Sequence, residues 1–113
     1  MSVSPNGVAA ERGDGYVLVR LSGEVDLSWS QEVRRAVLDA LAAGTPVGVE
    51  LSAVSYIDSS GIAALVEGFQ NARSKGSKFG LVAASSPVMS VLQLARLDKV
   101  FPLFASIEAA RAA

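Results

Sequence analysis

Apolar and polar positions along the chain alternate between a strand period and a helix period, and the N-terminal part predicts a hairpin. Residues 16–21 are rich in β-branched and aromatic side chains, which predicts a strand. A weaker strand pattern spans residues 3–11, and the glycine-containing cluster at 12–15 predicts a turn between the two segments. Residues 23–27 are then expected to form the loop that leaves the second strand.

A helical period follows this loop. Ser28 is the expected N-cap, with Gln31 as its capping partner, and Gly44 ends the segment. Trp29 is predicted to pack in the core, with partial exposure as a surface anchor as the alternative. The apolar positions that recur at helical spacing are Trp29, Val33, Ala36, Val37, Ala40 and Leu41.

Strand and helix patterns alternate through the remainder of the chain. This alternation requires crossover connections and favours parallel strands covered by helices, so residues 1–113 are predicted to form a single α/β domain. Met89, Leu94 and Leu97 lie off the predicted inner face of one helix, either as scattered surface residues or as a contact patch. The predicted elements are a strand at 47–51, a helix from 62 to a basic last turn before Gly76, a strand at 79–84, a helix opened by Ser86 and Pro87, a strand at 101–104 and a helix at 106–112.

Composition narrows the classes of function. A chain of 113 residues, 50% of them apolar, is long enough to bury a core. Its 10 basic and 11 acidic residues leave a formal net charge of −1. Since no basic excess attracts nucleic acid or anionic lipid, the expected partners are proteins and not nucleic acid.

The chain contains neither Cys nor His. Disulfides, thiol nucleophiles, the usual zinc sites and Ser-His-Asp catalysis are therefore excluded, and neither a metal nor a cofactor is expected. A serine hydrolase with a Ser–Lys pair stays open as an alternative. Residues 1–10 lack the pattern of a signal peptide, and no apolar stretch approaches the roughly 20 residues that cross a bilayer, so we expect a cytoplasmic protein without membrane insertion.

The most distinctive stretch is residues 56–62, Tyr-Ile-Asp-Ser-Ser-Gly-Ile, between an apolar strand and a helical period. Asp and Ser suit the capping of a helix N-terminus, because their oxygens accept its unpaired N–H groups. The same layout exposes the Ser59 hydroxyl at the positive end of a helix, where a phosphate is favourable. The two interpretations are compatible.

Together with residues 49–52, this junction resembles the signature of STAS domains, in particular those of bacterial anti-sigma factor antagonists. Residues 23–26 resemble the upstream loop of that family, and residues 78–82 and 86–88 resemble its later strand and the start of the following helix. The likeness covers nearly the whole chain. It implies a STAS fold, a small mixed sheet of four to five strands flanked by about four helices.

The resemblance implies a regulatory binding protein, not an enzyme, with no catalytic residue of its own. In such proteins the first serine of the Asp-Ser-Ser-Gly element, here Ser59, is phosphorylated by an anti-sigma factor that is also a serine kinase. The unphosphorylated form binds that partner, the phosphorylated form releases it, and a phosphatase resets the switch. The expected partner-binding residues are Asp26, Asp58, Ser60 and Gly61, and Gly61 is expected to leave room for the partner's active site.

Charge gives this switch a physical basis. If Asp26 reaches the junction, two carboxylates surround Ser59, and a phosphate would add like-charge repulsion at the contact. The principal alternative is a STAS subunit of a bacterial ABC system that moves phospholipids, in which the same turn contacts the transporter ATPase. The partner retrieved from cells distinguishes the two functions.

Overall fold

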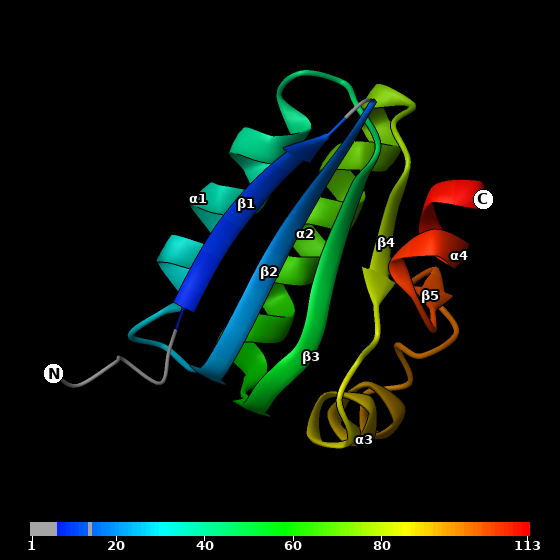
Figure 1. The fold of residues 1–113 in the computed structure, drawn as a ribbon. Helices are drawn as coiled ribbons and strands as arrows, with labels where there is room; N and C mark the ends of the chain where they lie inside the picture. Colours follow the sequence, from blue (N-terminus) through cyan, green and yellow to red (C-terminus); the bar gives the residue numbers. More distant parts are fainter. Residues whose placement is uncertain (1–6, 14) are drawn as a thin grey trace, which may run out of the picture.

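The computed structural model describes residues 7–13 and 15–113, which form one sheet with helices packed around it (Figure 1). The predicted α/β class and mixed sheet are confirmed: the described residues contain five strands and four helices. In chain order the elements are β1 (Gly7–Gly13), β2 (Tyr16–Val25), α1 (Ser30–Leu41), β3 (Val47–Ile57), α2 (Ser59–Lys75), β4 (Phe79–Val82), α3 (Ser86–Leu94), β5 (Leu103–Phe104) and α4 (Ile107–Ala112).

The strands lie in the sheet in the order in which they occur along the chain. β1 pairs with β2 in antiparallel fashion, and all later neighbours are parallel. The predicted hairpin is thus confirmed, with Gly15 at a φ of 69° in its turn. Residues 3–6 of the predicted first strand and Asp14 of the turn lie outside the described residues.

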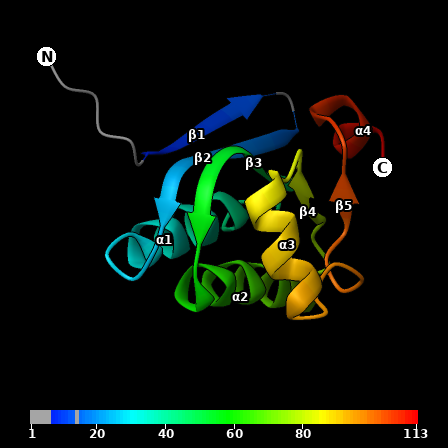
Figure 2. The same cartoon turned by 90° about the horizontal axis from the view of Figure 1, so that it is seen from below.

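Helices α1 and α2 cover one face of the sheet, and α4 lies beside β5 on the other side (Figure 2). The main core fills the space between the sheet and the two long helices, and includes Val19, Leu51 and Leu65. A smaller cluster on the opposite face joins β2 to α4 through Tyr16 and Ala110. The sheet therefore has one fully covered face and one that is covered only at the α4 end.

Two predicted strand ends are wrong. β2 continues to Val25, through the segment predicted to be a loop, and β3 continues from the predicted end at 51 to Ile57. The physical reason is their mutual pairing, which extends to Val25 opposite Ile57 and satisfies the backbone of both strands. Irregular register near Gly23, whose φ is 78°, absorbs the local misfit.

The later elements follow the predicted order with shorter strands. β4 ends at Val82 instead of Ala84, and β5 contains only residues 103–104. Leu94, the last residue of α3, is 86% exposed. Leu97, which follows the helix, packs against the core. Ala95, the C-cap of α3, is exposed.

Both ends of α2 are specified by the sequence. At the C-terminus, Gly76 adopts a φ of 69°, and its N–H donates to the carbonyls of Ala72 and Arg73. Arg73 and Lys75 lie in the last turn, as predicted, where positive charge is favourable. The sequence therefore determines where α2 ends.

Gly68 allows α2 to pack closely on its neighbours, which gives a first test of the fold. A Cβ at this position would lie 2.5 Å from Val37 Cγ1 and 3.3 Å from the Phe79 ring. We expect Gly68→Ala to lower the free energy of unfolding by about 1 to 2 kcal/mol, although alanine is the better helix former. Urea denaturation measures the change, with the exposed Gln70→Ala as the matched control. A more stable Gly68→Ala variant would contradict this packing.

Candidate functional site

The loops after β2 and β3 leave the sheet side by side. Val25 is paired with Ile57, and the Asp58 N–H donates to the Val25 carbonyl at 3.2 Å. In Figure 1 the arrowheads of both strands point to the same end of the sheet, where α3 also lies. The N-terminus of α2 is therefore next to the loop that begins at Asp26.

Asp58 is the N-cap of α2, and one of its oxygens organises the turn. Oδ1 accepts hydrogen bonds from the Ser60 N–H at 2.9 Å, the Gly61 N–H at 3.1 Å and the Ser60 hydroxyl at 2.6 Å. The predicted capping role of the junction is thus confirmed for Asp58, while Ser59 is the first residue of the helix. Ser60 contributes to the same cap through its side chain.

These contacts keep the Asp58 carboxylate ionised. The Ser60 hydroxyl makes the largest contribution to a lowered pKa of Asp58; burial opposes it, and backbone N–H groups of Gly61, Ser60 and Leu27 reinforce it. The smallest of these contributions comes from the Leu27 backbone, so the neighbouring loop lies close to the Asp58 carboxylate.

Ser59 projects from this turn into solvent. The residue is exposed, and its hydroxyl makes no hydrogen bond to any other part of the chain that the structure describes. Asp58 Oδ1 accepts hydrogen bonds from the Ser60 hydroxyl and from the N–H groups of Ser60 and Gly61. The Ser60 hydroxyl is therefore engaged, whereas the Ser59 hydroxyl is not. Of the two adjacent serines, only Ser59 presents an uncommitted oxygen to an approaching protein.

The loop after β2 repeats the same local geometry. Asp26 Oδ1 accepts hydrogen bonds from the Ser28 N–H at 3.0 Å and the Ser28 hydroxyl at 2.6 Å. The prediction that Ser28 caps the first helix is therefore wrong, because Asp26 holds its hydroxyl. α1 begins at Ser30 with Trp29 as an N-cap that makes no side-chain bond. Trp29 stays partly exposed, outside the buried core.

Two large apolar side chains near this end of the sheet are exposed, which the sequence alone did not predict. Leu27 occupies the position in its loop that Ser59 occupies in the other, and it is 75% exposed. Tyr56, two residues before Asp58, is 49% exposed. The repeated Asp-x-Ser spacing at 26–28 and 58–60 was the available signal, because it places Leu27 in a turn and not in a core.

Gly61 has a different role from the one expected. It is buried, and a Cβ at this position would lie 2.7 Å from Ile57 Cγ1, 2.8 Å from Val25 Cγ1 and 2.9 Å from the Val25 carbonyl oxygen. The space beside it is filled by the ends of β2 and β3 and not open to a partner. A glycine at this position lets the first turn of α2 approach both strands.

Within residues 7–13 and 15–113, no three acidic, Cys or His side chains converge as metal ligands. Over the same residues, no helix has both the length and the apolar character that a bilayer span needs.

The chain belongs to the STAS domain family, whose model matches residues 8–110. It is 28% identical over 107 residues to the anti-sigma-F factor antagonist RsfB of Mycobacterium tuberculosis, covering 92% of this chain and 87% of that protein. It is 27% identical over 99 residues to an anti-sigma F factor antagonist of Paenibacillus polymyxa, covering 86% and 85% respectively. The recognised resemblance to STAS proteins is thereby confirmed.

The fold of this chain is also similar to that of a solved anti-sigma factor antagonist. The crystal structure of an anti-sigma factor antagonist from Mycobacterium paratuberculosis superposes with a TM-score of 0.85 at 28% identity, covering 99% of this chain and 97% of that one. The agreement extends over the described sheet and helices and confirms the expected STAS fold.

The lowered pKa of Asp58 predicts a pH dependence of stability. A carboxyl whose folded pKa is depressed contributes stability that is present above its unfolded value of about 3.9 and is lost as the pH falls through the folded value. We expect the wild type to lose more of its free energy of unfolding than Asp58→Asn between about pH 7 and about pH 3, since asparagine caps without titrating. Urea denaturation at both pH values measures this. An equal loss in the two proteins would contradict the ionic role of Asp58.

Proposed function

We propose that this protein is an anti-sigma factor antagonist that binds its anti-sigma factor through the surface around Ser59. The single observation that carries the proposal is the exposed Ser59 hydroxyl at the N-terminus of α2, next to the Asp58 cap. Membership of the STAS family supports it, and so do the names of the relatives from Paenibacillus polymyxa and Mycobacterium tuberculosis. On this proposal the protein is a binding module of the cytoplasm and not an enzyme.

Phosphorylation of Ser59 by the partner is the proposed switch. The Ser59 oxygen forms a bond to the γ-phosphorus of ATP, the bond to ADP breaks, and the hydroxyl proton passes to a base. Asp58 is poorly suited to be that base, since its lowered pKa and its three donors favour the ionised, committed state. The kinase partner must therefore supply the base together with ATP and Mg²⁺.

The phosphate would remain at the surface and weaken docking. The Ser60 and Gly61 N–H groups, which a phosphate at a helix N-terminus would use, are already bonded to Asp58. An added charge of about −1.5 to −2 would instead face the carboxylates of Asp58 and Asp26 and the partner. Since each 1.4 kcal/mol of repulsion is about tenfold in affinity, release needs no refolding of this protein. A phosphatase would restore the binding form.

The partner surface is proposed to combine charge and apolar contact. Asp26 and Asp58 hold the two turns in shape, and Ser60 completes the second turn. Leu27 and Tyr56 supply the exposed apolar area beside them. Gly61 acts indirectly, by holding α2 against the strand ends.

Two other functions have less support. A subunit of an ABC phospholipid transporter would use the same turn, but the named relatives are anti-sigma factor antagonists. A tagged copy should therefore retrieve an anti-sigma kinase and not a transporter ATPase. A Ser–Lys hydrolase would need a base on Ser59, and no described residue hydrogen-bonds to that hydroxyl.

The phosphorylation site gives the first functional test. Incubation with the cognate anti-sigma kinase and ATP should add one phosphoryl group to the wild type and none to Ser59→Ala, as measured by intact-protein mass spectrometry. Ser60→Ala is the matched control and should still be modified, because its hydroxyl is committed to Asp58. Modification of Ser60, or none in the wild type, would contradict the proposal.

The exposed Leu27 side chain gives the second functional test. Leu27→Ala should weaken binding of the unphosphorylated protein to the anti-sigma factor about tenfold or more without changing its unfolding transition, because the side chain is 75% exposed. Isothermal titration calorimetry measures the affinity. Gln70→Ala, an exposed substitution further along α2, serves as the control. Equal affinities for the two variants would remove Leu27 from the interface.

A further inference from the structure

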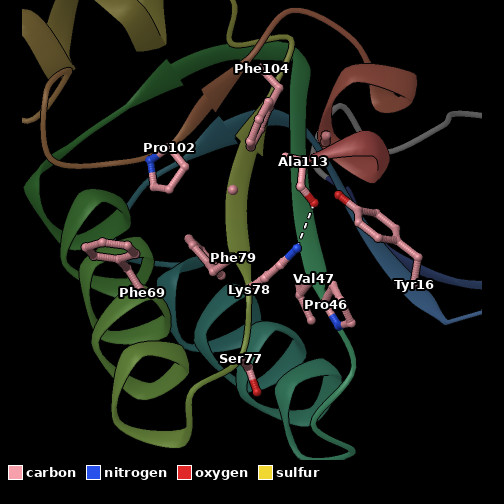
Figure 3. A pocket seen from close by; sticks show the side chains of 12 residues that line it. Tyr16, Pro46, Val47, Phe69, Ser77, Lys78, Phe79, Pro102, Phe104 and Ala113 are labelled. Atoms are coloured by element: carbon pink, nitrogen blue, oxygen red, sulfur yellow. Dashed lines mark hydrogen bonds between the residues drawn. The ribbon is translucent and has the colours of Figure 1, made fainter.

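A cavity of about 310 Å³ lies at the other end of the sheet from Ser59, beside the beginning of β4 (Figure 3). Its wall is mainly aromatic and aliphatic, which is the usual character of a site for a small ligand, and its volume is at the lower limit for such sites. The lining residues that define it are Tyr16, Phe69, Lys78, Phe79, Pro102 and Phe104.

The cavity exists because β5 leaves the edge of β4 uncovered. The two strands pair only at Leu81 opposite Leu103 and Val82 opposite Phe104. Continuing this parallel ladder by two residues would require the Pro102 nitrogen to donate to the Phe79 carbonyl, and proline has no N–H. The gap is therefore encoded in the sequence.

Glycine and the neighbouring rings shape the walls. A Cβ on Gly80 would lie 2.5 Å from Phe104 Cε2, so the absence of a side chain at residue 80 lets the Phe104 ring lie against β4. On the other side of β4, the rings of Phe69 and Phe79 are tilted at 49° with centroids 6.1 Å apart. In Figure 3 these two rings lie on one side of β4, and Tyr16 and Lys78 on the other.

A second cavity of about 180 Å³ adjoins the first and carries positive charge. The two share Tyr16, Pro46, Lys78, Ala110 and Ala113 in their linings. The second is also lined by Arg111, whose guanidinium lies 5.8 Å from the centroid of the Tyr16 ring. Among the described residues that line either cavity there is no Asp or Glu.

Lys78, one of the two cations, already has a hydrogen-bond acceptor. The Lys78 ammonium donates a hydrogen bond of 2.8 Å to the backbone oxygen of Ala113, as drawn in Figure 3. Lys78 is exposed, so its side chain can turn from this oxygen to another acceptor. The Lys78 ammonium could therefore donate a hydrogen bond to an anionic group placed where the two cavities meet.

We propose that these joined cavities bind a small amphipathic carboxylate, such as a medium-chain fatty acid. The apolar body would lie among the rings of Phe69, Phe79 and Phe104, and the carboxylate would lie between Lys78 and Arg111. Carboxylates form strong charge-assisted hydrogen bonds with both cation types, and a bound carboxylate would take the place of the Ala113 oxygen on Lys78. The site is remote from Ser59 and does not depend on phosphorylation.

Sodium decanoate, below its micellar concentration, is the probe for this site. Titration followed by amide NMR should give saturable shifts at residues 78–80 and 104 in the wild type. Lys78→Gln should bind about tenfold more weakly, a loss of ~1.4 kcal/mol. Ala110→Leu, which places extra volume in both cavities, should abolish saturable shifts. The neutral 1-decanol should bind more weakly than decanoate.

Lys99→Gln is the matched control, since this exposed lysine lines neither cavity, and its affinity should equal that of the wild type. If Ala110→Leu fails to give a cooperative unfolding transition, Lys78→Gln and the decanol titration decide the question. Two results would overturn the proposal. One is amide shift changes that are scattered over the surface and do not saturate with decanoate concentration, and the other is equal decanoate affinities for Lys78→Gln and Lys99→Gln.

Discussion

The Asp58 carboxylate is the interaction on which the candidate site depends. Its Oδ1 holds the Ser60 hydroxyl and the N–H groups of Ser60 and Gly61, and the Leu27 backbone lies near the same carboxylate. It therefore caps α2 and occupies two of the N–H donors that would otherwise draw in an anion. Ser59 is exposed in this turn, and the neighbouring Ser60 hydroxyl, unlike that of Ser59, is already bonded to Asp58.

The sheet makes this arrangement possible. β2 and β3 are parallel neighbours that end in register, so each delivers an Asp-x-Ser turn to the same place. Gly61 lets the first turn of α2 approach Val25 and Ile57, which joins the two turns to the core. A small charge change at residue 59 can thus alter the outer surface while the packed interior stays as it is.

Much of this could be predicted from the sequence, because periodicity and capping residues report local structure. The α/β order, the Asp58 cap and the Gly76 stop were all readable in this way. The ends of β2 and β3 were not, since mutual pairing sustains strands through residues that favour loops, such as Gly23. The roles of Ser28 and Gly61 were missed for a related reason: a hydroxyl engaged by Asp26 and a glycine against Val25 are tertiary contacts without a sequence period.

The central claim is that phosphate on Ser59 acts by local charge and not by refolding. The most direct measurement compares fully phosphorylated and unphosphorylated protein, both for affinity to the anti-sigma factor and for backbone amide chemical shifts. The account predicts an affinity at least about tenfold lower, with shift changes confined to residues near 26–28 and 56–61. Unchanged affinity, or shift changes throughout the sheet and α1, would contradict it.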